Sequence, residues 1–111
     1  MTLDHRNRLY LDHMLECIGR IKNYTELNRA TFLGSEMVQD AVVRNLQTLA
    51  ESSQKLSEDF KAGSPHIDWR AISGFRNILV HDYLGLDLER IWLVIEQDLP
   101  HLEATLRRAV D

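Results

Sequence analysis

The stretch WRAISGFRNILVHDYLG, residues 69–85, predicts a helix whose apolar and polar side chains lie on adjoining sides. Three apolar residues recur at spacings of three and four, which forms a buried ridge on one helical face: Ile72, Phe75 and Leu79. Asp68 is suited to cap the start of this helix, and Gly85 is suited to close it. We therefore predict a helix from Trp69 to about Tyr83.

The same periodicity extends over the rest of the chain. It predicts long helices over residues 3–24, 35–61 and from 88 to the C-terminus, and a short helical segment ending near Phe32. Pro100 is expected to kink the last helix near Asp98, because proline removes a backbone hydrogen bond and clashes with the preceding turn. No alternating strand pattern appears and the connections are short, so we predict an all-α, up-and-down bundle of four to five helices.

The polar side of the predicted helix 35–61 has its own pattern. Glu51 and Lys55 lie opposite the apolar stripe, and Glu51 precedes Lys55 by four residues, the favourable order for a surface ion pair. Ser35 is suited to cap this helix, and Asp87 is suited to cap the helix that begins at residue 88. We therefore expect Glu51 and Lys55 to face solvent.

Composition restricts the classes of protein to consider. The 111 residues are 44% hydrophobic and 27% charged, which fits a single globular domain over residues 1–111. No apolar run is long enough for a membrane span or a signal peptide, so a cytoplasmic protein is expected. Cys17 is the only cysteine and the five histidines are scattered, so no metal site is predicted. The net charge of −4 disfavours nonspecific coating of nucleic acid, and any RNA contact must be local.

Four polar residues share one broad side of the predicted helix 69–83. With about 100° per residue, Tyr83 lies at about −20° from Arg76, Asn77 at about 100° and His81 at about 140°. Histidine can exchange a proton with a ribose hydroxyl or a leaving oxygen, and arginine can hold phosphate oxygens. These residue types therefore suit phosphodiester cleavage without a metal.

A structural role remains open for the same residues. An arginine on an apolar helix is often paired with a carboxylate, and a histidine is often hydrogen-bonded to the backbone. One helix also carries only one histidine, whereas acid–base chemistry on two sides of a phosphate is served better by two. A symmetric dimer would bring a second Arg76 and a second His81 into one cleft.

Residues 65–83 resemble the signature of HepT-type HEPN proteins, the toxins of HepT/MntA toxin–antitoxin pairs. The chain has the arginine, four intervening residues, the histidine, one residue and the tyrosine, with asparagine after the arginine. Residues 40–46, Glu51 and residues 98–100 extend the likeness, whereas Ser52 departs from the usual alanine. Arg44 and Glu51 match family positions without an assigned chemistry, so a solvated helix face remains an equal interpretation for both.

The resemblance implies a homodimeric, metal-independent endoribonuclease that needs no cofactor and cleaves RNA such as tRNA or mRNA in a cleft at the dimer interface. It implies that Arg76 and His81 are catalytic and that Asn77 is a supporting polar group. Tyr83 would be modified with AMP by a cognate MntA-type nucleotidyltransferase antitoxin, which would neutralise the toxin, in a complex that could be larger than the dimer.

Two other interpretations remain. The first is a catalytically inactive HEPN dimer that acts as binding partner and AMP acceptor of a nucleotidyltransferase, which the net charge of −4 favours slightly. The second is a helical bundle with a purely structural, dimerising role, in which Arg76 and His81 are paired internally and tolerate substitution.

Overall fold

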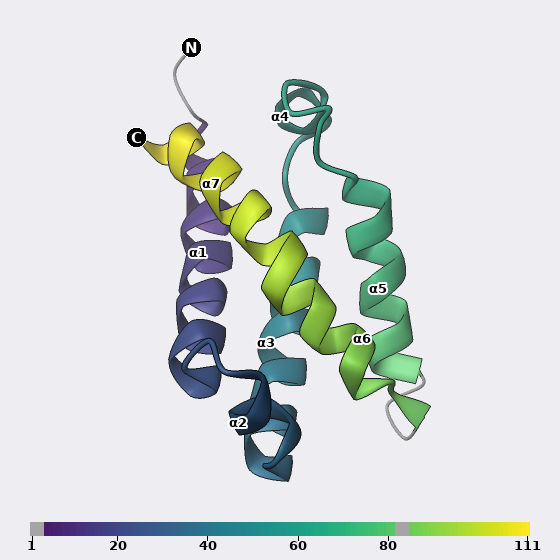
Figure 1. The fold of residues 1–111 in the computed structure, drawn as a ribbon. Helices are drawn as coiled ribbons and strands as arrows, with labels where there is room; N and C mark the ends of the chain where they lie inside the picture. Colours follow the sequence, from purple (N-terminus) through teal and green to yellow (C-terminus); the bar gives the residue numbers. More distant parts are fainter. Residues whose placement is uncertain (1–3, 82–84) are drawn as a thin grey trace.

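The structure, a computed structural model, describes residues 4–81 and 85–111. All regular structure in these residues is helical, which confirms the predicted all-α class. The chain runs up and down through four long segments (Figure 1): α1 (His5–Thr25), α3 (Glu36–Gln54), α5 (Trp69–His81), and a C-terminal segment from α6 (Leu88–Leu93) to α7 (Leu99–Val110). A short helix, α2 (Arg29–Leu33), connects α1 to α3, as predicted.

One apolar core joins these segments. Helices α1 and α3 bury apolar faces in this core, and Cys17 lies in it with no exposed surface. Helix α5 contributes Leu79, which is 1% exposed, but Ile72 and Phe75 are only partly buried. The predicted ridge on α5 is therefore confirmed at Leu79, whereas Ile72 and Phe75 pack against the core and are only partly buried. Helix α5 packs mainly on α3, and its side toward the C-terminal helices remains open.

The predicted helix 35–61 is interrupted. Helix α3 ends at Gln54, and a separate short helix, α4 (Glu58–Ala62), follows. Between them Leu56 is buried, and the Ser57 side chain accepts a hydrogen bond from the backbone N–H of Phe60 at 3.2 Å. Asn7 donates to the Ser57 hydroxyl and accepts from the Ser57 backbone N–H, both at 3.0 Å. The prediction of one continuous helix was wrong, because the burial of Leu56 and the two hydrogen bonds between Asn7 and Ser57 turn the chain at this point.

Other sequence signals place the helix boundaries correctly. The side chains of Ser35, Asp68 and Asp87 accept hydrogen bonds from backbone N–H groups at the starts of α3, α5 and α6. Pro100 lies in the first turn of α7, and residues 94–98 before it form a π-helical turn. The predicted distortion near Asp98 is confirmed. None of the helices within residues 4–81 and 85–111 combines the length and apolar character that a membrane-spanning segment needs.

Candidate active site

Helix α5 carries three of the four predicted site residues. Asn77 and His81 are exposed, and the Arg76 side chain is partly buried, with 29% of its surface exposed. His81 follows Arg76 by five residues. This spacing places it about 7.5 Å further along the helix axis and turns its side chain about 140° round the axis from that of Arg76. The fourth residue, Tyr83, lies outside the described residues.

Two neighbouring side chains hold the Arg76 guanidinium. One Nη atom lies 3.0 Å from a carboxylate oxygen of Glu51 on α3, and the other donates to the side-chain oxygen of Asn77 at 3.4 Å. A guanidinium has five N–H donors, so these contacts use only part of its capacity. Arg76 is therefore fixed in direction but retains donors that a phosphate group could use.

The position of Glu51 corrects the sequence-based expectation. Glu51 pairs with Arg76 across the boundary between α3 and α5, and its side chain is 39% exposed. Lys55, its expected partner, lies just beyond the last residue of α3 and is exposed. The prediction of a surface ion pair between Glu51 and Lys55 was wrong, because α3 ends before Lys55 and because α5 runs beside the polar side of α3. The family position of Glu51 was the one sequence signal for its role.

His81 is the last described residue of α5, and its side chain is exposed. In residues 4–81 and 85–111, no hydrogen bond of its imidazole ring is found, so none joins it to Arg76 or Asn77. The structure thus brings Arg76 and Asn77 together but leaves His81 separate within one copy of the chain. The exposed imidazole is available to exchange a proton with a bound molecule.

A polar cluster lies between α1 and α3 and consists of His13, Cys17, Thr48 and Ser52. His13 Nδ1 lies 2.6 Å from the hydroxyl of Ser52, and the Cys17 sulfur lies 3.4 Å from the hydroxyl of Thr48. Burial raises the pKa of the Cys17 thiol, although the bond with Thr48 opposes this effect. A buried thiol of raised pKa is a poor nucleophile, so this cluster is structural. It also gives Ser52, the departure from the family's alanine, a hydrogen-bond partner.

The second family position on α3 has no such contact. Arg44 is exposed, and no ion pair involves it in the described part of the chain. The two family-matched positions therefore differ, because Glu51 contacts a predicted site residue and Arg44 faces solvent.

The all-α, up-and-down bundle with arginine, asparagine and histidine on α5 fits the predicted resemblance to HEPN proteins. The model of the family described as "Ribonuclease HepT-like" matches residues 14–109. The chain therefore belongs to the HepT-like ribonuclease family, which confirms the resemblance predicted from residues 65–83.

Similar proteins include several whose names describe them as probable or putative ribonucleases. The "Probable ribonuclease HepT" of Thermococcus cleftensis is 33% identical over 109 residues, which cover 97% of each chain. "Putative RNase MJ1380" of Methanocaldococcus jannaschii is 29% identical over 97 residues, 86% of this chain and 89% of that one. "Gamma-glutamylcyclotransferase and putative RNase MJ0434" of the same organism is 32% identical over 105 residues, 94% of this chain. The present chain spans about half of that last protein, 47% of its length. No solved structure matches the chain.

Proposed function

We propose that this chain is the toxin of a toxin–antitoxin pair, a metal-independent endoribonuclease that cuts RNA such as tRNA or mRNA. The observation that carries the proposal is the arrangement on α5 of a chain of the HepT-like family. A guanidinium held by Glu51 and Asn77 is followed by an exposed imidazole. The fixed guanidinium can bind a phosphate, and the imidazole can move a proton.

The chemistry assigns one role to each residue. Arg76 binds the oxygens of the scissile phosphate and stabilises the negative charge that grows in the transition state. His81 takes the proton from the ribose 2′-hydroxyl or gives one to the leaving oxygen. Asn77 supports the guanidinium through its side-chain oxygen.

The separation of Arg76 and His81 supports a site built by two copies. The two side chains point about 140° apart on one helix, so a single α5 does not enclose a phosphate between them. In a symmetric dimer a second α5 supplies a second arginine and a second histidine. One histidine can then act as base while the other acts as acid.

The first prediction concerns cleavage. Arg76→Ala and His81→Ala should each lower the rate of RNA cleavage by about a hundredfold or more, because general acid–base catalysis alone contributes about 10²–10⁴-fold. The measurement is cleavage of labelled RNA by purified protein in the presence of a chelator, together with growth inhibition in cells. Arg44→Ala, which removes an exposed arginine from α3, is the matched control and should cleave normally. Unchanged cleavage by both α5 variants would overturn the proposal.

The second prediction concerns regulation. We propose that a cognate MntA-type nucleotidyltransferase attaches AMP to Tyr83, where the added phosphate and nucleoside would compete with RNA through charge and bulk. Protein produced together with that enzyme should be heavier by one or more AMP units, located on Tyr83 by peptide mapping. Tyr83→Phe protein should stay unmodified and toxic. A Tyr83→Phe protein that the antitoxin still neutralises would contradict this regulation.

A second candidate function is a catalytically inactive dimer that docks a nucleotidyltransferase and accepts AMP. The net charge of −4 favours it, because a negative protein binds RNA less readily. Incubation of the purified protein with RNA and chelator separates the two functions, since only the enzyme cuts.

A further inference from the structure

Four polar residues of α5 follow one another along a single face of the helix. Arg70, Ser73, Asn77 and His81 are spaced at three, four and four residues, so they lie above one another. Arg70 precedes Asn77 by seven residues and His81 by eleven, and its side chain points within about 20° of each of theirs. These four residues form the polar track of α5, which is about 16.5 Å long along the helix axis.

The polar track is open to solvent and carries no negative charge. Three of its members are exposed, and Ser73 is partly buried. Helix α5 contains two arginines and neither aspartate nor glutamate, although the whole chain has a net charge of −4. Exposed faces elsewhere mix both signs of charge, as Arg8 and Asp12 do on α1. The track is therefore a local positive surface on an acidic chain.

The two arginines of α5 have different surroundings. Arg76 is held by Glu51 and Asn77, as described above. Arg70 is exposed, and no ion pair or hydrogen bond of its side chain is found in the part of the chain that the structure describes. Asp68, two residues before it, is engaged as the cap of α5. The N–H donors of the Arg70 guanidinium are therefore available to a bound anion.

We propose that Arg70 binds a phosphate of the RNA strand beyond the phosphate that is cut. The inference rests on the proposed function and deepens it, because it gives the strand a path across the candidate active site. Arg70 and Arg76 are about 9 Å apart along the axis, and their side chains point about 120° apart. The two guanidiniums thus diverge too far to hold the same phosphate, but they can bind two phosphates of one strand.

The residues between the two ends of the track suit the same ligand. The strand runs from His81 toward the start of α5 and passes Asn77 and Ser73. The amide nitrogen of Asn77 and the hydroxyl of Ser73 can donate hydrogen bonds to phosphate or sugar oxygens, which are the usual partners of such side chains in nucleic-acid complexes. Phosphate contacts of this kind fix the position of a strand without reading its sequence.

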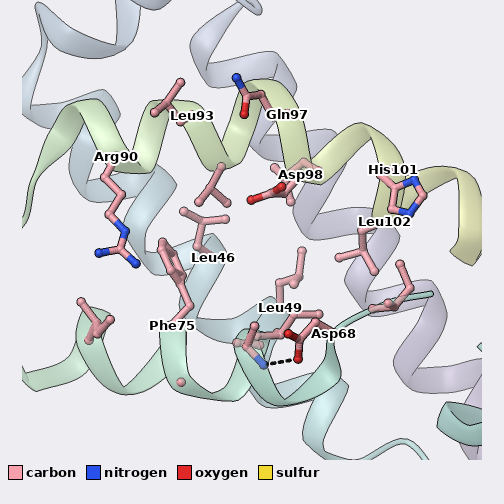
Figure 2. Close-up of a pocket in the computed structure, with 18 of the residues that line it drawn as sticks. Leu46, Leu49, Asp68, Phe75, Arg90, Leu93, Gln97, Asp98, His101 and Leu102 are labelled. Atoms are coloured by element: carbon pink, nitrogen blue, oxygen red, sulfur yellow. Dashed lines mark hydrogen bonds between the residues drawn. The ribbon is translucent and has the colours of Figure 1, made fainter. Parts of the chain in front are cut away.

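The opposite side of α5 does not suit a strand of phosphates. Phe75 precedes Asn77 by two residues and points about 160° away from it. It points into an open groove of about 740 Å³ between α5 and the C-terminal helices, whose floor is formed by aliphatic side chains of α3 (Figure 2). Arg90 lines this groove at one end, but Asp68 and Asp98 lie toward the other end and repel phosphates. We therefore place RNA on the polar track.

The test measures binding of a strand that the protein cannot cut. A fluorescently labelled 2′-O-methyl RNA oligonucleotide lacks the hydroxyl proton that the proposed reaction removes, so its anisotropy reports binding alone. Arg70→Ala should weaken this binding by about tenfold, the size of a charge-assisted hydrogen bond. Arg70→Lys, which keeps the charge, should lose less. The slope of the logarithm of the binding constant against the logarithm of salt concentration should become shallower by about 0.7 in Arg70→Ala protein, because one contact with a single strand is lost.

Two controls separate a local contact from a general loss of charge. Arg20→Ala removes the same charge from α1, which packs on α3 and α7, and should bind as the wild type does. Arg70→Ala should also weaken the binding of two unrelated sequences to the same extent, because phosphates carry no base information. Circular dichroism checks that each variant remains helical. A wild type that does not bind the oligonucleotide, an equal loss in both variants, or a loss for only one sequence would overturn the inference.

Cleavage by the same proteins separates this inference from the proposed function. Arg70→Ala should raise KM for RNA by about tenfold and leave kcat unchanged, since the contact forms in both the bound substrate and the transition state. Weaker binding by Arg70→Ala, together with a wild type that cuts no RNA, would support the phosphate contact and refute the ribonuclease. Cleavage by the wild type with a KM that Arg70→Ala leaves unchanged would refute the contact and support the ribonuclease.

Discussion

Glu51 holds the side chain of Arg76 on α5 in one direction. Its carboxylate lies 3.0 Å from an Nη atom of Arg76, and both side chains are partly exposed. An ion pair at such a boundary contributes only about 0.2–1 kcal/mol to stability. Its larger effect is directional, because a flexible arginine side chain held at one end of its guanidinium samples fewer positions. We interpret Glu51 as a positioning residue for Arg76.

The third prediction concerns the effect of Glu51 on catalysis. If Arg76 binds the scissile phosphate, Glu51→Ala should lower kcat by about tenfold to a hundredfold, because small misplacements of a catalytic group are costly. Glu51→Gln should be less impaired, since its amide oxygen can still accept a hydrogen bond. KM for RNA should not rise, because the substitution removes a negative charge from the site. Single-turnover and steady-state cleavage provide the measurement.

A matched control is Glu58→Ala, which removes a carboxylate from α4 that is almost fully exposed. That variant should cleave as the wild type does. A Glu51→Ala protein with unchanged kcat, or one whose defect lies wholly in KM, would contradict the positioning role.

At the scale of the helices, boundaries depend on capping and on long-range contacts. The caps at Ser35, Asp68 and Asp87 follow from residue type and the apolar pattern that succeeds them. The break between α3 and α4 has a comparable local signal, because Ser57 is followed by two acidic residues in the first turn of α4. The apolar spacing continues through Leu56 and Phe60, however, and for this reason the sequence predicted one continuous helix over residues 35–61. The contact that fixes the break joins Ser57 to Asn7, fifty residues away.

The fourth segment illustrates what one residue type can predict. Pro100 cannot donate a backbone hydrogen bond to the preceding turn, so a distortion before it follows from covalent structure. The form of the distortion, a π-helical turn over Val94–Asp98, was not predictable, because it depends on how the segment packs. Ile95 in this turn remains 3% exposed, so the wider turn keeps the apolar face in the core.

At the scale of the whole molecule, Glu103 connects the first helix to the last. Its carboxylate accepts hydrogen bonds from Lys22 of α1 and Arg107 of α7, both at 3.1 Å. Burial, the largest single influence, raises the pKa of Glu103, but the bonds from Lys22 and Arg107 outweigh it. The pKa therefore lies below its ordinary value of 4.5.

The fourth prediction concerns pH. A carboxyl group with a lowered folded-state pKa stabilises the fold fully above its ordinary pKa of 4.5, and this stability is lost as pH falls through the lowered value. Glu103→Gln should therefore lower the free energy of unfolding by about 1 kcal/mol at pH 7. The difference from wild type should shrink steadily below about pH 4.5. Urea unfolding at several pH values measures it, and a constant difference down to about pH 2 would contradict the assignment.

The class of the fold and the location of the candidate site follow from local patterns. Apolar spacings of three and four specified the helices, and the arginine, asparagine and histidine of residues 76–81 lie on α5 as their spacing requires. Both results depend on helix geometry, which is a property of consecutive residues. Tyr83, also predicted from this pattern, lies outside the described residues and stays a prediction.

Local sequence patterns were thus sufficient to predict an all-α bundle and the residues that one helix displays together. Tertiary packing was needed to establish that Glu51 faces Arg76, that the chain turns at Leu56, and that α5 stands apart from the C-terminal helices. A helical wheel gives the direction of each side chain relative to its own axis but contains no information about the neighbouring helix. The partner of Arg76 and the open groove depend on how separate helices pack, and packing joins residues that are distant in the sequence.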